Sequence, residues 1–147
     1  MTRAFVEIEG ETIGAIGLGW AVLLGVGQGD DEAAAVRLAA RVAHLRAFAD
    51  KAGRMNRSLL EVGGAALVVP QFTLYADTRR GRRPSFVGAA PPERAAPLVE
   101  CFVAALGALG AAVEVGRFGA HMVVDITNDG PVTFLLEELP TRRRPLR

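Results

Sequence analysis

The chain has 147 residues, half of them hydrophobic, and a formal net charge of only +1 at pH 7. This length suits one domain with a substantial core, and no apolar run is long enough to span a membrane. Met1 leads directly into an alternating strand pattern and not into a signal-peptide core. A single cysteine, Cys101, excludes an intrachain disulfide, and two histidines make a His/Cys metal site implausible. We therefore expect a soluble cytoplasmic protein with no metal and no cofactor.

The first third of the chain predicts strands followed by a helix. Residues 6–16 alternate in polarity around a glycine turn, which predicts a β-hairpin, and the apolar run at residues 20–26 predicts a buried strand. The spacing of Gly25, Gly27 and Gly29 matches no nucleotide-binding fingerprint, so these glycines indicate a tight turn. Asp30 or Asp31 is expected to cap a helix that extends to about Ala49.

The remaining elements complete the expected fold. Residues 55–58 suggest a loop, the apolar run at residues 65–69 a buried strand, and residues 92–109 a second helix. Strands are expected near residues 112–115, 121–126 and 132–136. Because these helices and strands do not alternate regularly, the pattern predicts an α+β fold, with largely antiparallel sheets in a barrel-like core covered by two main helices.

The positive charge is almost entirely arginine, and part of it is gathered in two clusters. They comprise Arg79, Arg80, Arg82 and Arg83 in mid-chain, and Arg142, Arg143, Arg144 and Arg147 in a basic tail that begins near residue 140. Planar guanidinium groups suit contacts with phosphate. A solvated loop and a frayed tail explain the same pattern equally well.

The best polar candidates for a site follow the buried strand at residues 65–69. Gln71 and Thr73 lie at its end, where backbone N–H groups and an amide can hold a developing oxyanion. Thr73 has no evident base in the sequence that would make it a nucleophile. Both side chains serve equally well to satisfy hydrogen bonds at the end of a sheet, so the local pattern leaves their role open.

Gly130-Pro131 is the second unusual feature. In isolation it is a turn, and X–Pro bonds are cis in only about 5–6% of cases. A cis bond there would place two carbonyl oxygens in an unusual orientation and make a rigid stereochemical wall. The sequence does not fix the isomer.

Several long motifs resemble those of the D-aminoacyl-tRNA deacylases. They are Gln71-Phe72-Thr73-Leu74-Tyr75-Ala76-Asp77-Thr78, Gly81-Arg82-Arg83-Pro84-Ser85-Phe86, Gly116-Arg117-Phe118-Gly119-Ala120, and Asn128-Asp129-Gly130-Pro131-Val132-Thr133. Shorter matches occur at Leu23-Leu24-Gly25-Val26 and from Lys51 to Asn56. The motifs occur in the family's order from near the N-terminus to about Leu136, which makes the resemblance specific.

The resemblance implies a homodimer that hydrolyses the ester between a D-amino acid and the 3′ end of tRNA, and that also removes glycine from mischarged tRNA. It implies that Gln71, Phe72 and Thr73 form the catalytic motif and that Pro70, Met122, Asn128 and Thr133 line the substrate pocket. Gly130-Pro131, in cis, would enter the partner's active site and leave no room for an L side chain. The tRNA's terminal 2′-hydroxyl would assist catalysis, and Arg79, Arg80, Arg82 and Arg83 would bind tRNA.

Two departures from the family pattern bear on this expectation. Pro70 stands where serine is usual, which removes a hydroxyl and a backbone N–H. The same proline resembles that of animal-type tRNA deacylases, which have looser chirality and act on L-alanyl-tRNA, whereas Phe72 and Asn128-Asp129 match the D-specific branch. Family members also begin with a further strand of about eight residues, and Met1 of this single domain of residues 1–147 aligns just after it. Either the chain has lost that strand or its start was placed late.

Other functional classes remain as alternatives. A tRNA-binding homologue without catalysis would bind tRNA through residues 79–83 in a salt-dependent way. A small-ester hydrolase would depend on Thr73 and would need no tRNA. The absence of a triad and the length of the matching motifs favour the deacylase.

Overall fold

The computed structural model describes residues 1–140, so the expected tail at Arg142, Arg143, Arg144 and Arg147 lies outside the described residues. In chain order the elements are β1 (Arg3–Ile8), β2 (Glu11–Ile16), β3 (Gly19–Leu24), α1 (Glu32–His44), β4 (Phe48–Ala49), β5 (Met55–Arg57), β6 (Ala65–Pro70), the 3₁₀ turn η1 (Phe72–Tyr75), α2 (Pro92–Ala108), β7 (Ala112–Val115) and β8 (Val123–Thr127). This set confirms the α+β class.

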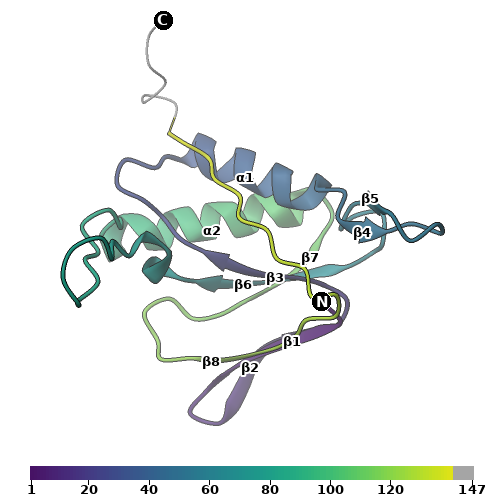
Figure 1. Ribbon diagram of the computed structural model, residues 1–147, viewed down its shortest axis with the longest axis horizontal. Coiled ribbons are helices and arrows are strands. Elements are labelled where there is room, and N and C mark those ends of the chain that lie inside the picture. Colours follow the sequence, from purple (N-terminus) through teal and green to yellow (C-terminus); the bar gives the residue numbers. More distant parts are fainter. Residues whose placement is uncertain (141–147) are drawn as a thin grey trace, which may run out of the picture.

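Three layers build the molecule (Figure 1): the helices α1 and α2, a sheet of order β3-β6-β7, and a second sheet of order β2-β1-β8. The β2-β1-β8 sheet is antiparallel, as expected from the hairpin at its start, with Val6 opposite both Gly14 and Val124. Between the two sheets lies a small core that includes Val6, Ile16 and Leu67.

The β3-β6-β7 sheet is parallel, which differs from the expectation of largely antiparallel sheets. Each parallel connection contains a helix, α1 between β3 and β6 and α2 between β6 and β7. Parallel neighbours need such crossovers, and both helices cover the same face of the sheet (Figure 1). The main core, which includes Phe102, Leu106 and Val68, lies beneath them.

Helix α1 is shorter than expected. Asp31 caps it, accepting a hydrogen bond from the Ala34 backbone N–H, but the helix ends at His44 and not near Ala49. Residues 48–49 instead form β4, which pairs with β5. Residues 55–57, which were expected to lie in a loop, form this β5 strand. The chain leaves the helical path before Phe48, whose ring packs on Trp20 at 4.8 Å between ring centroids.

Two further expectations are corrected. Residues 132–136 form no strand, although most of their side chains are apolar; the segment runs alongside a cavity and not alongside a strand partner. In α2 the buried residues are Ala95, Val99, Phe102 and Leu106. The helix ends at Ala108, so Leu109, the expected last residue, is its C-cap and is exposed. Neither helix within residues 1–140 combines the length and apolar character needed to cross a membrane.

Candidate active site at the end of β6

The site begins where β6 leaves the parallel sheet. Residues 66–69 are fully buried because both faces of this sheet are covered. The Gln71 backbone N–H then donates to the Leu24 carbonyl at 2.7 Å, which ends the pairing of β6 with β3. The next residues turn into η1, closed by a hydrogen bond from the Leu74 N–H to the Gln71 carbonyl at 3.3 Å. A rigid buried strand thus ends in a tight turn at the surface.

The turn presents an amide, a ring and a hydroxyl together. The Gln71 side-chain amide donates to the Thr73 hydroxyl oxygen. Phe72 is 59% exposed, and its ring packs edge-on against Phe86 with centroids 5.0 Å apart. Gln71 is the one side-chain partner found for Thr73 within residues 1–140, so no base activates its hydroxyl in this arrangement. This geometry fits Thr73 as a pocket residue better than as a nucleophile.

Tyr75 and Asp30 hold this turn in place, and sequence analysis assigned neither of them such a role. The Tyr75 ring packs on Gly25 and Gly27; a Cβ added at Gly27 would lie 2.7 Å from it. Asp30 does not cap α1. Its carboxylate accepts hydrogen bonds from the Gly27 backbone N–H at 2.7 Å and from the Tyr75 phenol. The alternating glycines were the available signal, since glycine often marks a close approach.

The environment of Tyr75 favours its neutral form. Partial burial is the largest cause, and the negative charges of Asp30 and Glu137 add to it, so the pKa of the Tyr75 phenol is raised above its ordinary value. The phenol therefore keeps its proton, and the hydrogen bond to Asp30, throughout the neutral range.

Pro70 and Met122 come together on the other side of the β6 end. Gly116 lies between them: a Cβ there would be 2.8 Å from the Met122 sulfur and 3.7 Å from Pro70 Cδ. The Gly116 N–H donates to the Val68 carbonyl at 2.8 Å, which fixes this glycine against β6. Two of the expected pocket residues are thus neighbours.

The arginine-rich loop follows η1 and projects into solvent. Its base is closed by reciprocal backbone hydrogen bonds between Asp77 and Ser85, at 2.7 and 2.9 Å. Arg79 pairs with Asp77 at 2.8 Å, and its side-chain hydrogen bond is the largest cause that lowers the pKa of Asp77 to about 2. Part of the positive charge of Arg79 is therefore neutralised. Arg80, Arg82 and Arg83 are exposed, as an RNA-contacting loop requires.

Gly130-Pro131 lies in an exposed loop after β8, and its peptide bond is cis. The Asn128 side-chain amide donates to the Val132 carbonyl at 3.4 Å across this loop. No contact recorded for residues 1–140 joins the loop to Gln71, Phe72 or Thr73 of the same chain. The expected pocket residues Asn128 and Thr133 line the same cavity as Leu74 and Tyr75 of η1.

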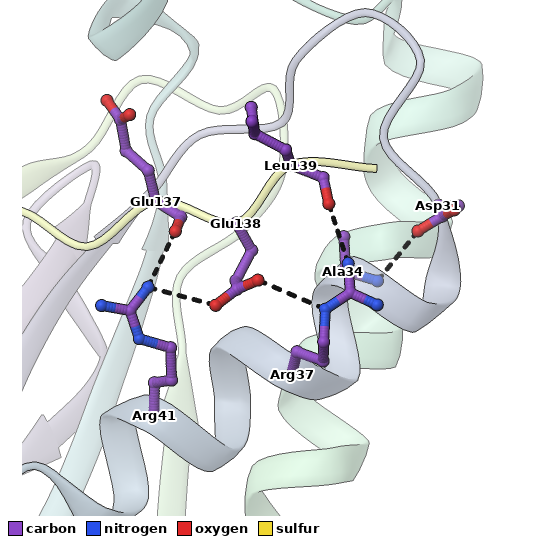
Figure 2. Close-up of polar contacts among 7 residues, drawn as sticks. All are labelled: Asp31, Ala34, Arg37, Arg41, Glu137, Glu138 and Leu139. Carbon is purple, nitrogen blue, oxygen red and sulfur yellow. Dashed lines mark hydrogen bonds and ion pairs between the residues drawn. The ribbon is translucent and has the colours of Figure 1, made fainter. Parts of the chain in front are cut away.

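The segment that continues from this loop, residues 132–140, crosses α1 and is here called the strap. Figure 2 shows how α1 holds it. Arg37 binds the Glu138 carboxylate at 3.2 Å and the Leu139 carbonyl at 2.8 Å, and Arg41 binds Glu138 at 3.1 Å and the Glu137 carbonyl at 2.8 Å. Between the strap and β3 lies an apolar cavity of about 1060 Å³.

Within the described part of the chain no group of three or more His, Cys, Asp or Glu residues is placed to bind a metal ion. His44 is exposed at the end of α1, and Cys101 lies partly buried on α2.

Comparisons with known proteins identify the family. A family profile described as "D-Tyr-tRNA(Tyr) deacylase" matches residues 1–137. The chain is 62% identical over 137 residues to a D-aminoacyl-tRNA deacylase of Roseiflexus sp. (strain RS-1), covering 93% of this chain and 88% of that protein. It is 58% identical over 142 residues to one of Thermomicrobium roseum, covering 97% and 92%.

Two solved structures are similar. A "c-Myc DNA Unwinding Element Binding Protein" matches with a TM-score of 0.89 and 37% identity over 94% of both chains. A "probable eukaryotic D-amino acid tRNA deacylase" shares the fold, with a TM-score of 0.74 and 16% identity over 89% of this chain and 91% of that one. The chain therefore belongs to the D-Tyr-tRNA(Tyr) deacylase family of enzymes.

Proposed function

We propose that this chain hydrolyses the ester between a D-amino acid and the 3′ end of tRNA, as the names of its relatives describe for them. The observation that carries the proposal is the turn after β6, where the Gln71 amide, the Thr73 hydroxyl and the exposed Phe72 ring are presented together. Gln71 and Thr73 orient the ester, and Phe72 offers an apolar surface to the terminal nucleoside.

Stabilisation of charge comes from the start of η1. The N–H groups of Phe72 and Thr73 precede the first hydrogen bond of the turn, so they remain available to a developing oxyanion. The attacking group is supplied by the substrate: the terminal 2′-hydroxyl of the tRNA assists cleavage while the protein positions the ester. This role of the substrate accounts for a site in which Thr73 has a hydrogen-bond partner but no base.

Chiral selection depends on a second copy of the chain. The Gly130-Pro131 loop is exposed, which supports its entry into the pocket of a partner subunit in a homodimer. There its carbonyl oxygens hold the substrate's amino group and exclude an L side chain. Glycine has no side chain to exclude, so tRNA-Ala mischarged with glycine is also a substrate. The reaction takes place in the cytoplasm, where aminoacylated tRNA is found.

Pro70 favours a second candidate, a deacylase with relaxed chirality that also cleaves L-alanyl-tRNA. The proline ring lies close to the Gly116–Met122 contact and offers neither the hydroxyl nor the N–H of a serine. Replacing Pro70 with serine should restore those groups. We expect the variant to cleave D-tyrosyl-tRNA faster relative to L-alanyl-tRNA than the wild type does.

Hydrolysis of D-tyrosyl-, glycyl- and L-alanyl-tRNA by the wild type and Pro70→Ser tests both candidates. Cleavage of the first two esters, with rejection of the third, supports the D-specific function. A D-tyrosyl-tRNA whose terminal 2′-hydroxyl is replaced by hydrogen should not be cleaved. If the wild type cleaves none of the three esters faster than buffer does, the alternative of a tRNA-binding homologue without catalysis is correct instead.

A further inference from the structure

The β4–β5 hairpin, residues 48–57, is the most prominent charged projection outside the site. Figure 1 shows it extending beyond the end of α1, at the opposite end of the molecule from η1 and the arginine-rich loop. The Asp50 carboxylate accepts hydrogen bonds from the backbone N–H groups of Ala52 and Arg54, at 2.8 and 3.0 Å, and from the Asn56 amide at 3.2 Å. These bonds stabilise a defined turn.

Basic side chains gather on this hairpin and its base, and all of them are exposed: Arg46, Lys51, Arg54 and Arg57. Arg46 donates to the Asn56 carbonyl at 2.9 Å, and Arg57 donates to the Glu61 carbonyl at 2.8 Å. Neither guanidinium group takes part in the salt bridges formed within residues 1–140. The Lys51 and Arg54 side chains have no ion pair among those formed by residues 1–140.

An aromatic contact connects the hairpin to the strap. The Trp20 ring packs against Phe48 of β4 at 4.8 Å and against Phe134 of the strap at 6.2 Å, between centroids. Phe134 follows Pro131 closely in the sequence. The base of the hairpin and the loop that carries Gly130-Pro131 are therefore held to the same side chain of β3.

We propose that the β4–β5 hairpin is a second RNA-binding surface, which contacts the phosphate backbone of the tRNA whose 3′ end lies in the partner subunit's pocket. The inference rests on the proposed function: if Gly130-Pro131 enters the partner's pocket, the hairpin attached through Trp20 is brought to the same pocket. Lys51 and Arg54 reach the phosphates, and the guanidinium groups of Arg46 and Arg57 add to the local positive charge.

The first test separates RNA contact from chemistry. We expect Lys51→Gln/Arg54→Gln to raise the KM for D-tyrosyl-tRNA about tenfold with kcat unchanged, and to reduce the salt slope of kcat/KM by about 1.5 to 2, because two phosphate contacts are lost. Cleavage of D-tyrosyl-adenosine, which has the ester but no acceptor stem, should not change. Lys51→Arg/Arg54→Lys keeps both charges and should behave as the wild type.

The second test asks which subunit's hairpin acts. In a mixed dimer, one chain carries Gln71→Ala together with Lys51→Gln/Arg54→Gln, and the other chain is wild type. Only the wild-type chain then has an active pocket, called the live pocket, and this pocket faces the altered hairpin of the partner chain. We expect the raised KM for D-tyrosyl-tRNA. Placing Lys51→Gln/Arg54→Gln on the live chain instead, opposite a Gln71→Ala partner, should restore the wild-type KM.

Each remaining outcome has a definite meaning. An unchanged KM and salt slope, an equal loss on D-tyrosyl-adenosine, or a raised KM only when the altered hairpin belongs to the live chain would overturn the inference. A wild type that cleaves neither substrate contradicts the proposed function instead. In that case, comparing the salt dependence of tRNA binding by the wild type and by Lys51→Gln/Arg54→Gln tests the RNA-binding surface alone.

Discussion

The Tyr75 phenol donates a hydrogen bond to the Asp30 carboxylate, and this contact joins the turn η1 to the glycine-rich loop after β3. The same carboxylate accepts from the Gly27 N–H at 2.7 Å, so Asp30 serves both segments. That loop also pairs with the end of the arginine-rich segment, where the Gln28 N–H donates to the Gly88 carbonyl at 2.9 Å. Three segments distant in sequence thus meet around one tyrosine ring.

Removing only the hydroxyl of Tyr75 should weaken this junction without creating a cavity. We expect Tyr75→Phe to lower the free energy of unfolding by about 1 kcal/mol, because one partly buried hydrogen bond is lost. Hydrolysis of D-tyrosyl-tRNA should slow through kcat, since η1 contains Thr73 and directly follows Gln71. Denaturant unfolding and single-turnover kinetics measure the two effects. If kcat stays at the wild-type value, Tyr75 does not position the turn.

The pKa of Tyr75 gives a prediction for alkaline pH. It is raised above the ordinary value of a tyrosine, first by burial and then by the charge of Asp30. The folded state therefore binds this proton more tightly than the unfolded state does. The resulting stabilisation is complete below about pH 10, and it is lost as the pH rises through the folded-state pKa. Tyr75 is the sole tyrosine, so its ultraviolet absorbance reports this titration directly. Asp30→Asn should lower the midpoint, and an unchanged midpoint would contradict the assignment.

Gly27 leaves room for the Tyr75 ring, and a methyl group at this position should displace it. The added Cβ would lie 2.7–2.8 Å from ring atoms, so we expect Gly27→Ala to cost about 1–3 kcal/mol. Gly107→Ala is a matched control in α2. Nothing lies within 4 Å of its added Cβ, and alanine should stabilise that helix by about 0.5–1 kcal/mol. Thermal melting of the two variants should therefore shift in opposite directions.

Much of the fold is readable from local patterns, and the deviations arise from long-range packing. The hairpin of β1 and β2, the buried strands β3 and β6 and the start of α1 follow from alternation, apolar runs and the cap at Asp31. The end of α1 does not, because the packing of Phe48 on Trp20 overrides a continuing helical pattern. Strand direction is likewise hidden in a sequence: an apolar run is the same in parallel and antiparallel sheets.

The contacts between α1 and the strap should matter more for local order than for global stability. The side chains of Arg37, Arg41 and Glu138 are 38%, 47% and 21% exposed, so we expect Glu138→Gln to cost less than about 1 kcal/mol. Backbone amides of residues 132–139 should nevertheless exchange faster with solvent, while those of β6 do not. Glu100→Gln, at an exposed position of α2, is the control. Unchanged exchange in the strap would show that other contacts hold it.

The candidate site was only partly predictable. Its polar groups at Gln71 and Thr73 follow from their place after a buried strand, because strand ends present side chains at the surface. Tyr75 and Asp30 could not be paired from sequence, since their contact depends on how η1 folds back over the glycines. The separation of Gly130-Pro131 from Gln71 in one chain is likewise a property of the assembled sheets.

The contact between Phe134 and Trp20 and the salt bridges of Glu138 fix two points on the strap beyond Pro131. Because Phe134 is held against Trp20, the number of residues between Phe134 and Pro131 decides where the proline tip stands. A single inserted or deleted residue would shift the tip by one step along the backbone, and related chains should therefore differ here by substitution but not by length.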